Sequence, residues 1–530
     1  MTQEELIAAE VPIDKFALLS KEDMVIYFKL EQNFRIQLQR RVAKLEALAE
    51  ELKEQRFCLE EKYVTIKNEI FGKSSERRAS NEGKAGPVSS AGDKKSKVRV
   101  LLPSERYPDA QLIERRVTLD EMPSCRCCGV EMSDSGMTED SEFLTVVPKQ
   151  YLVIRVMRHK YRCVSCHGDL VTAPAPPRIK SGSSYSDEMA IDVAMTKYCD
   201  LVPIERYSKM AEREGLKGLP PQSLIESTHY LAAYVRGAYE RLKGEITASR
   251  VLHADETPHR MLEGDQKSSW FLWGFSGKRT SYFECHSTRS GDVASKLLTD
   301  SRCEYLMSDV YSGYGKAVRE TNQARELEGR PKIRSIYCNA HARRRFKEAA
   351  ESFPGDAEFY LQMYDKIYGL EREVRSKPPD RCSEALELRR QMLPLFEAMR
   401  SRAVADTDGF SSKSSMGRAM SYFLGNFAEF TLFVTDATLP IDNNPQERLL
   451  RSPVIGRKTW YGTHSKQGAE TAAILFSLVE SCKLNQVNPR EYFRRLVSAL
   501  HQGQAAFTPH EFERMAAAAI TSAPQHVTTE

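Results

Sequence analysis

The sequence predicts a multidomain α/β protein, and three observations support this prediction. Residues 24–71 place apolar side chains at a seven-residue spacing, which is typical of a coiled-coil helix. Two Cys-x-x-Cys pairs lie between residues 125 and 166, and from residue 250 short apolar segments alternate with helical ones. A chain of 530 residues is long enough for three or four domains.

Composition sets broad limits on location and partners. Hydrophobic residues make up 41% of the chain, which is ample for buried cores, and the net charge of +4 indicates little by itself. Residues 334–347 nevertheless hold a cluster of basic residues and no acid, which suits a polyanion, although a solvated helix face is the usual explanation. No apolar run is long enough to span a membrane, and the first residues lack a secretory signal. We therefore expect a cytoplasmic protein with no membrane partner, whose 12 cysteines are thiols or metal ligands.

Residues 1–72 are expected to form a helical coiled coil. The stretch 24–71 contains no proline or glycine. The residues that recur every seven positions are Leu38, Leu45, Leu52, Leu59 and Ile66. Such a stripe favours pairing between chains, so we expect a homodimer or a larger oligomer, with an amphipathic helix packed on its own protein as the alternative. Residues 73–100 are rich in Gly, Ser, Lys and Glu, which predicts a flexible linker.

Residues 101–180 are predicted to form a zinc-binding module. Cys125 and Cys128 form one pair, and Cys163 and Cys166 form the other. Each pair offers two thiolates on a tight turn, and together they supply the four ligands of a tetrahedral, structural Zn²⁺ site. The alternative is a set of unrelated buried cysteines. Because a closed site with four protein ligands leaves no open position, we expect no chemistry there.

Residues 181–248 are expected to form a helical domain. Ser186 can cap a first helix, a second runs from about Ile204 to Glu214, and Pro220-Pro221 leads a third. This pattern is compatible with a helix-turn-helix module whose third helix reads DNA. The turn is longer than usual and the third helix is not very basic, so a purely structural helical domain is the alternative.

From residue 249 the pattern changes to that of a sheet covered by helices. Residues 249–349 show three strands, a helix, a strand, a helix, a strand and a helix, in that order. Two of these strands end in an acid: the apolar run from Val251 ends at Asp255, and the run from Tyr305 ends at Asp309. We interpret this segment as the first part of a catalytic core.

The second part of that core is expected in residues 436–500. The preceding residues 350–435 have helical periodicity and no strand signal, which predicts a helical insertion. Asn443 and Asn444 are expected to cap a helix that carries Glu447 in its first turn, where the helix dipole favours a carboxylate. Residues 501–530 would form a C-terminal tail.

Acids that end two strands of one sheet can meet at its edge, and a third acid on a later helix can complete a metal site. Carboxylate oxygens are the ligands that Mg²⁺ and Mn²⁺ prefer, and two such ions can support phosphoryl transfer. We expect Glu447 as the third ligand, with Asp442 and Glu256 as the competing acids. Asp442 precedes the helix, where capping is the expected role, and Glu256 should face away from Asp255 if the strand continues.

Basic residues surround the expected third acid. The cations in residues 442–458 are Arg448, Arg451, Arg457 and Lys458. A second group consists of Arg343, Arg344 and Arg345. We expect both groups to hold phosphates of double-stranded DNA. The alternative is a capped surface helix with ordinary ion pairs.

Several motifs of the chain resemble those of one protein family. These are His253-Ala254-Asp255-Glu256-Thr257, the segment Ser308–Tyr314, the segment Cys338–Arg344 and the segment Asp442–Arg448. The match continues through Gly456-Arg457-Lys458 and the segment Ser477–Lys483, and upstream through Ile70–Glu76 and the cysteine pairs. Together these motifs resemble the IS66 family of bacterial transposases over nearly the whole chain.

The resemblance implies a DDE transposase with a ribonuclease-H-like core, a mixed sheet interrupted by the helical insertion. Asp255, Asp309 and Glu447 match the acidic triad, which implies two Mg²⁺ or Mn²⁺ ions, and the implied partners are the element ends, target DNA and helper proteins. Cys338 and His341 match a Cys-x-x-His pair found in several transposase groups, with a buried cysteine beside a packed histidine as the alternative. The chain departs from the family pattern at Ser452 and at Thr459-Trp460-Tyr461, and neither departure removes a carboxylate.

Two other functions are compatible with the same residues. A zinc-containing regulator could bind DNA through the cysteine pairs and the helical domain while the core is inert. A ribonuclease-H-like nuclease could hydrolyse DNA without joining strands. Three acids at strand and helix ends argue against the regulator, because binding alone does not need them. Strand-joining products would distinguish a transposase from a nuclease.

Overall fold

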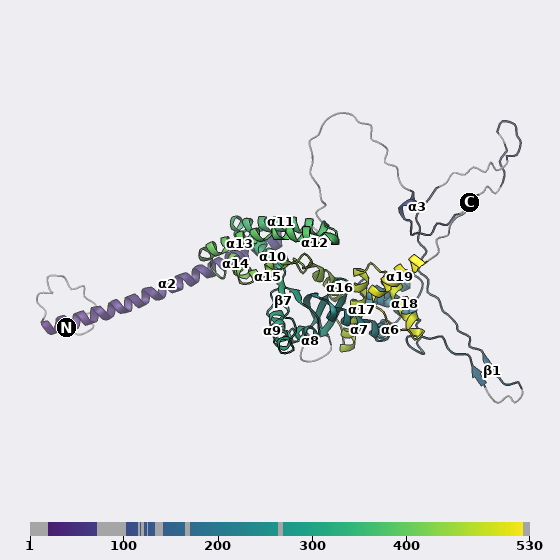
Figure 1. Ribbon diagram of the computed structural model, residues 1–530, viewed down its shortest axis with the longest axis horizontal. Coiled ribbons are helices and arrows are strands. Elements are labelled where there is room, and N and C mark those ends of the chain that lie inside the picture. The colour runs from purple at the N-terminus through teal and green to yellow at the C-terminus, as the bar shows by residue number, and fades with distance from the viewer. Residues whose placement is uncertain are drawn as a thin grey trace. The chain divides into compact units, whose positions relative to one another are not determined.

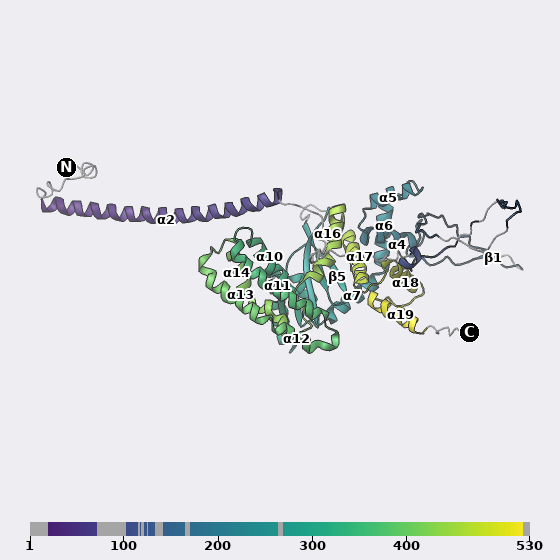
Figure 2. The same cartoon turned by 90° about the horizontal axis from the view of Figure 1, so that it is seen from above.

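The computed structural model describes residues 20–71, 102–114, 117, 121–124, 126–132, 141–164, 170–262 and 269–522. Contacts between residues divide the chain into two units (Figures 1 and 2). The first unit comprises Met1–Lys73, Ala173–Lys209 and Leu219–Glu530, and the second comprises Ser74–Thr172 and Met210–Gly218. No helix in the described residues is long and apolar enough to cross a membrane.

The first unit is built on a five-stranded mixed sheet. Its strands are β3 (Val251–Arg260), β4 (Ser269–Ser276), β5 (Ser281–His286), β6 (Tyr305–Ser308) and β7 (Arg334–Tyr337). The strand order is β5-β4-β3-β6-β7. Strands β3, β4 and β5 pair antiparallel, whereas β6 and β7 run parallel to β3. The mixed α/β architecture and the order of strands and helices expected from the sequence are therefore confirmed.

Strand β3 is longer than the sequence predicted. The apolar run ends at Asp255, but β3 continues to Arg260 through Pro258, paired with β4 along that length. Strand β6 pairs with β3 only as far as His253. Beyond that point one side of β3 has no strand partner, so proline is tolerated there although it lacks a backbone donor.

Two hydrophobic cores lie on the faces of the sheet. Neighbouring residues of β6 divide between them: Leu306 belongs to the core shared with β3, β4 and β5, and Met307 to the core of the helical insertion. The helices of the first core are α4 (Asp187–Tyr198), α6 (Pro221–Tyr234), α7 (Arg236–Ala248), α8 (Asp292–Thr299), α9 (Ser312–Leu327), α16 (Asn444–Trp460), α17 (Lys466–Leu484) and α18 (Pro489–His501). The short helix α5 (Ile204–Arg213) contributes residues to both units, and α19 (Pro509–Ser522) contacts α17.

Helix α17 covers the outer strand of the sheet. The backbone N–H groups of Ser281 and Phe283 in β5 donate to the hydroxyls of Ser481 and Ser477, at 3.0 and 2.8 Å. The two serines are four residues apart and therefore lie on one face of the helix. This pairing satisfies donors that an edge strand would otherwise expose.

The segment 350–435 is helical throughout and contains no strand, as the sequence predicted. Its helices are α11 (Pro354–Ser376), α12 (Cys382–Arg390), α13 (Leu393–Asp406), α14 (Ser415–Gly425) and α15 (Phe427–Thr431). They pack with one another and, through α11 and α14, with α10 (Asn339–Ala349), on the side of the sheet away from α17 in Figure 2. A buried ion pair joins Arg389 to Glu371 at 2.9 Å, and Arg389 also donates to the carbonyls of Phe433, Asp436 and Leu439. Arg389 thereby fixes the chain segment that leads back to the sheet.

The N-terminal helix α2 (Lys21–Phe71) is continuous over 51 residues (Figure 1). The three members of the expected apolar stripe whose side chains are described, Leu38, Val42 and Leu45, are about half exposed or more, at 51%, 47% and 64%. The helix is thus as the sequence predicted, and the part of its apolar stripe whose side chains are described is exposed. Pairing of this face between chains stays a prediction.

The second unit holds a short helix and a small hairpin. Helix α3 spans Pro103–Arg106, and β1 (Lys160–Arg162) pairs antiparallel with β2 (Leu170–Thr172). An isolated bridge between Ser124 and Glu131 closes a turn around Cys127 and Cys128. Gly129 ends this turn with φ = +75°, a conformation that favours glycine. The predicted ligands Cys125 and Cys166 lie outside the described residues, whereas Cys128 and Cys163 lie within them.

Candidate active site

Asp255 and Asp309 lie at equivalent positions on neighbouring strands. Strands β3 and β6 run parallel, and their register pairs His253 with Met307. Each aspartate comes two residues after its member of that pair, and Asp309 directly follows β6. Because neighbouring strands lie about 4.8 Å apart, this register brings both carboxylates to one place at the end of β6.

The environment of Asp255 disfavours its negative charge. Burial raises the pKa of its carboxyl group from 3.8 to about 8, and the charges of Glu256, Asp309 and Glu447 act in the same direction. The backbone N–H of Glu256 donates to Asp255 Oδ1 at 2.9 Å, which only partly offsets the rise in pKa. A buried group of acids that repel one another is a favourable setting for a divalent cation, and carboxylate oxygens are suitable ligands for Mg²⁺ or Mn²⁺.

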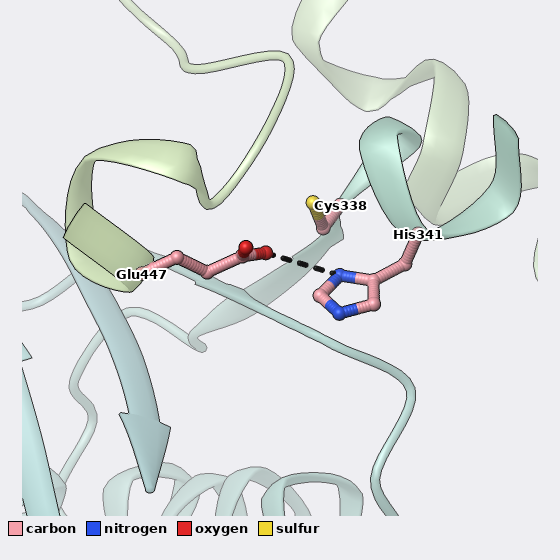
Figure 3. Close-up of side chains that lie close together, drawn as sticks. All are labelled: Cys338, His341 and Glu447. Atoms are coloured by element: carbon pink, nitrogen blue, oxygen red, sulfur yellow. Dashed lines mark ion pairs between the residues drawn. The ribbon is translucent and has the colours of Figure 1, made fainter. Parts of the chain in front are cut away.

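Glu447 reaches the same region from the first turn of α16. Its charge contributes to the raised pKa of Asp255. Its carboxylate oxygens also face α10: Oε1 is 3.7 Å from His341 Nδ1 (Figure 3), and Oε2 is 3.7 Å from Arg344 Nη2. Among the described residues, the group of three whose ligand atoms all lie within 4.8 Å of one another is Cys338, His341 and Glu447, not the three acids. Glu447 therefore belongs to a close group with two residues at the start of α10, whereas the three acids do not form a group of this compactness.

Asn443 fixes the start of the Glu447 helix against the sheet. Its side-chain Oδ1 accepts a hydrogen bond from His253 Nδ1 at 2.9 Å, and its Nδ2 donates to the Ala254 carbonyl at 3.0 Å. Its backbone carbonyl accepts from the Glu447 N–H at 3.1 Å. Asn443 occupies the N-cap position of α16, as the sequence predicted, but its side chain makes no capping hydrogen bond and bonds to β3 instead.

Gly274 permits α16 to approach the sheet closely. Gly274 lies opposite Asp255 in the pairing of β3 with β4. A Cβ atom at this position would lie 2.2 Å from Gln446 Nε2 and 2.9 Å from a ring carbon of Phe283. Gln446 is fully buried and directly precedes Glu447. A larger residue at Gly274 would therefore require the buried Gln446 side chain and the Phe283 ring to shift.

The two competing acids have other partners. Asp442 is buried, its Oδ1 accepts from the Asn444 N–H at 3.2 Å, and its Oδ2 lies 3.7 Å from Arg375 Nη2. Asp442 thus supports the start of α16, the capping role expected for it. Glu256 is held by the hydroxyl of Tyr314 and by Arg289, whose Nε donates to Oε1 at 2.7 Å. These contacts leave Glu447 as the acid with a carboxylate oxygen available near the aspartates.

The predicted DNA-binding cations differ in their surroundings. Of those on α16, Arg448, Arg451 and Lys458 are exposed and form no ion pair with a residue that the structure describes. Arg457 is half-buried, and it donates to the hydroxyl of Thr257 and to the carbonyl of Pro258. It therefore ties α16 to β3, which is a structural role that the sequence did not predict.

The cations of α10 border an open groove. Arg343, Arg344 and Lys347 line one side of it, facing Tyr368 and Arg372 of α11. Arg343 pairs with Asp365 at 3.0 Å. Arg345 lies outside the groove, with its guanidinium 4.0 Å from the centre of the Tyr422 ring. The lining also includes Glu348, Glu351 and Asp365, so its four cations face three acids. The groove lies next to Glu447, because Arg344 contacts both.

Comparisons with known proteins match both parts of the chain. A family model described as "Transposase IS66 family" matches residues 182–471, which include the sheet, the insertion and Glu447. A second model, described as the zinc-finger binding domain of transposase IS66, matches residues 123–167, which include both cysteine pairs. Two similar proteins of Sinorhizobium fredii (strain NBRC 101917 / NGR234) are the uncharacterized proteins y4hP and y4qI. They are 24% and 27% identical to the chain over 443 and 442 residues, and each alignment covers 78% of this chain and 78% or 77% of the relative.

Proposed function

The chain belongs to the IS66 transposase family, and we propose that it binds the ends of an insertion sequence in the cytoplasm and catalyses metal-dependent DNA cleavage and strand transfer. Asp255, Asp309 and Glu447 would form the catalytic centre. The observation that carries this proposal is the register of β3 and β6, which supports neighbouring positions for the two aspartates, each two residues after the last pair His253–Met307. The influence of Glu447 on the pKa of Asp255 supports its role as the third acid.

A ribonuclease-H-like core is part of this proposal. The order β5-β4-β3-β6-β7, with three antiparallel strands followed by two parallel ones, supports it. Within the proposed domain boundaries, residues 249–349 and 436–500 would form the core, and residues 350–435 the insertion. The helical segment 181–248 would have a structural role, because α6 has no Lys or Arg and packs on α4 and α17.

The acids fit the ions that this chemistry needs. Two Mg²⁺ or Mn²⁺ ions would activate the attacking oxygen, first of water and then of the freed 3′-hydroxyl, and would stabilise the leaving oxygen. Asp255 and Asp309 would hold them from the sheet. Glu447 would complete the site by moving from His341 toward the aspartates. The bound cations would favour this movement, because they neutralise the three carboxylates that otherwise repel one another.

Double-stranded DNA would cross the surface formed by α10 and α16. The exposed Arg448, Arg451 and Lys458 would hold backbone phosphates on one side of Glu447, and Arg343 and Arg344 would do so on the other. Arg345 and Arg457 would contribute through their charge while supporting the fold. The side chains of Cys125, Cys128, Cys163 and Cys166 would bind one structural Zn²⁺ ion, and α2 would pair two chains so that both element ends are held.

The test is incubation of the protein with candidate element ends and Mn²⁺, followed by sequencing of joined products. Wild-type protein should join ends to target DNA. Asp309→Asn should abolish joining and keep end binding, whereas Arg451→Ala should weaken binding and reduce its dependence on salt. Cleaved but unjoined products would favour the nuclease alternative. Equal loss of binding in both variants would show that the roles are wrongly assigned.

A further inference from the structure

Three potential metal ligands meet beside the proposed catalytic site (Figure 3). The sulfur of Cys338, a ring nitrogen of His341 and a carboxylate oxygen of Glu447 all lie within 4.8 Å of one another. Cys338 is fully buried, and the side chains of His341 and Glu447 are 26% and 27% exposed. The cluster thus lies just below the protein surface, where solvent has limited access to it.

Two atoms of this cluster lack hydrogen-bond partners among the described residues. His341 Nδ1 and Glu447 Oε1 are buried, and neither makes a hydrogen bond with a residue that the structure describes. They face each other at 3.7 Å, which is too long for a hydrogen bond between nitrogen and oxygen. Buried polar atoms are rarely left unpaired, because removing them from water without a new partner destabilises the folded protein. A cation between the two atoms would satisfy both.

Burial raises the pKa of the Cys338 thiol to about 12, so the thiolate forms only when a metal ion binds, but two features of the local structure favour that bound thiolate. Helix α10 begins at Asn339, so Cys338 precedes its first residue and His341 lies in its first turn. The N-terminal end of a helix favours a negatively charged sulfur. The backbone N–H of Asn443 also donates to Cys338 Sγ, at 3.1 Å. Such donors around a ligand are typical of the outer shell of a metal site.

We propose that Cys338, His341 and Glu447 form a binding site for one Zn²⁺ ion, separate from the zinc-binding module. Sulfur and imidazole nitrogen are ligands that Zn²⁺ prefers, whereas Mg²⁺ prefers oxygen, so the site distinguishes the two ions. Ligand atoms about 2.1 Å from a tetrahedral ion are about 3.4 Å apart, so a separation of 3.7 Å needs little adjustment. Binding would release the Cys338 thiol proton and leave the fourth position to water.

The consequence of this site rests on the proposed function. Glu447 Oε1, held by Zn²⁺ beside α10, is withdrawn from the two aspartates. The Zn²⁺-bound state would therefore lack its third catalytic acid, and excess Zn²⁺ would inhibit cleavage in the presence of Mg²⁺. The site couples zinc availability to activity by competition for one side chain.

The first experiment counts metal ions and does not depend on DNA. Full-length protein is equilibrated with Zn²⁺ by dialysis, and bound zinc is measured per chain. We expect two ions in wild-type protein and one in Cys338→Ser and in His341→Gln. Cys303→Ser is the matched control, because Cys303 is equally buried and belongs to no such cluster among the described residues, and it should keep two ions. A single bound zinc ion per chain in wild-type protein would overturn the proposed site. So would a second zinc ion that stays bound in both Cys338→Ser and His341→Gln.

The second experiment tests the coupling. DNA cleavage with Mg²⁺ is measured at increasing Zn²⁺ for wild type, Cys338→Ser and Cys303→Ser. Loss of the ligand should raise the Zn²⁺ concentration needed for half inhibition about 10-fold or more, and the control should behave as wild type. Equal inhibition of all three would refute the capture of Glu447. If wild-type protein did not cleave DNA with Mg²⁺ and no added Zn²⁺, the proposed function would be refuted. The number of bound zinc ions would still show whether the Cys338 site exists.

Discussion

Replacing Asp255 with asparagine should stabilise the core when catalytic metal is absent. In the folded protein the pKa of Asp255 is raised to about 8 from 3.8, chiefly by burial. Between these two values the folded state keeps a proton that the unfolded state has lost, so the free energy of unfolding falls as the pH rises. Below 3.8 both states are protonated, and above about 8 the destabilisation is complete.

The magnitude follows from the same values. Each pH unit between 3.8 and 7 costs about 1.4 kcal/mol, so the charge of Asp255 destabilises the core by at most about 4 kcal/mol at pH 7. Asparagine has nearly the same shape and no charge, and it removes this cost. Because the acids also repel one another, relaxation of Glu447 toward His341 should make the measured gain smaller than this limit.

The assay is urea-induced unfolding in Mg²⁺-free buffer at pH 5 and pH 7.5, with the zinc-binding module loaded. Asp255→Asn should be more stable than wild type at pH 7.5, and the difference should shrink at pH 5. Added Mg²⁺ should stabilise wild type more than the variant. Asp300→Asn is the control, because Asp300 belongs to the same unit and its side chain is exposed. This substitution should change the free energy of unfolding little. A variant no more stable than wild type at pH 7.5, or one with the same pH dependence, would refute the reasoning.

Three further predictions address the other parts of the chain. Cys125→Ser should lower bound zinc by one ion per chain and unfold the zinc-binding module while the sheet stays folded, as seen by metal analysis and limited proteolysis. Removal of residues 1–72 should lower the mass measured in solution by light scattering, and an unchanged oligomer would assign the exposed stripe of α2 to another role. Asn443→Ala should destabilise the core by about 2 kcal/mol or more, because it leaves His253 Nδ1 and the Ala254 carbonyl unpaired, and should reduce cleavage more than end binding.

Local sequence patterns predicted the two strands next to the candidate aspartates. The apolar runs that end at Asp255 and Asp309 are short and bounded, as buried strands are, and the structure contains both strands. The absence of strand signals in residues 350–435 likewise predicted the helical insertion. These features depend on residues close together in the sequence, which is why they could be predicted.

Contacts between distant segments could not be predicted in the same way. Asn443 looked like a helix cap, a local role, but its side chain bonds to β3 about 190 residues earlier. The Cys-x-x-His spacing placed Cys338 and His341 on one turn, yet nothing local indicated that Glu447 would face them. Arg457 was expected to bind DNA, and its contact with Pro258 depends on β3 continuing past a proline.

The central claim is that Asp255, Asp309 and Glu447 hold the catalytic metal ions together. The most direct test is a crystal structure of the full-length protein soaked with Mn²⁺, with the ions located by anomalous scattering. We expect Mn²⁺ bound between Asp255 and Asp309, with the Glu447 carboxylate moved from His341 to the same ions. Mn²⁺ held by Asp442 instead of Glu447, or no Mn²⁺ at the two aspartates, would contradict the account.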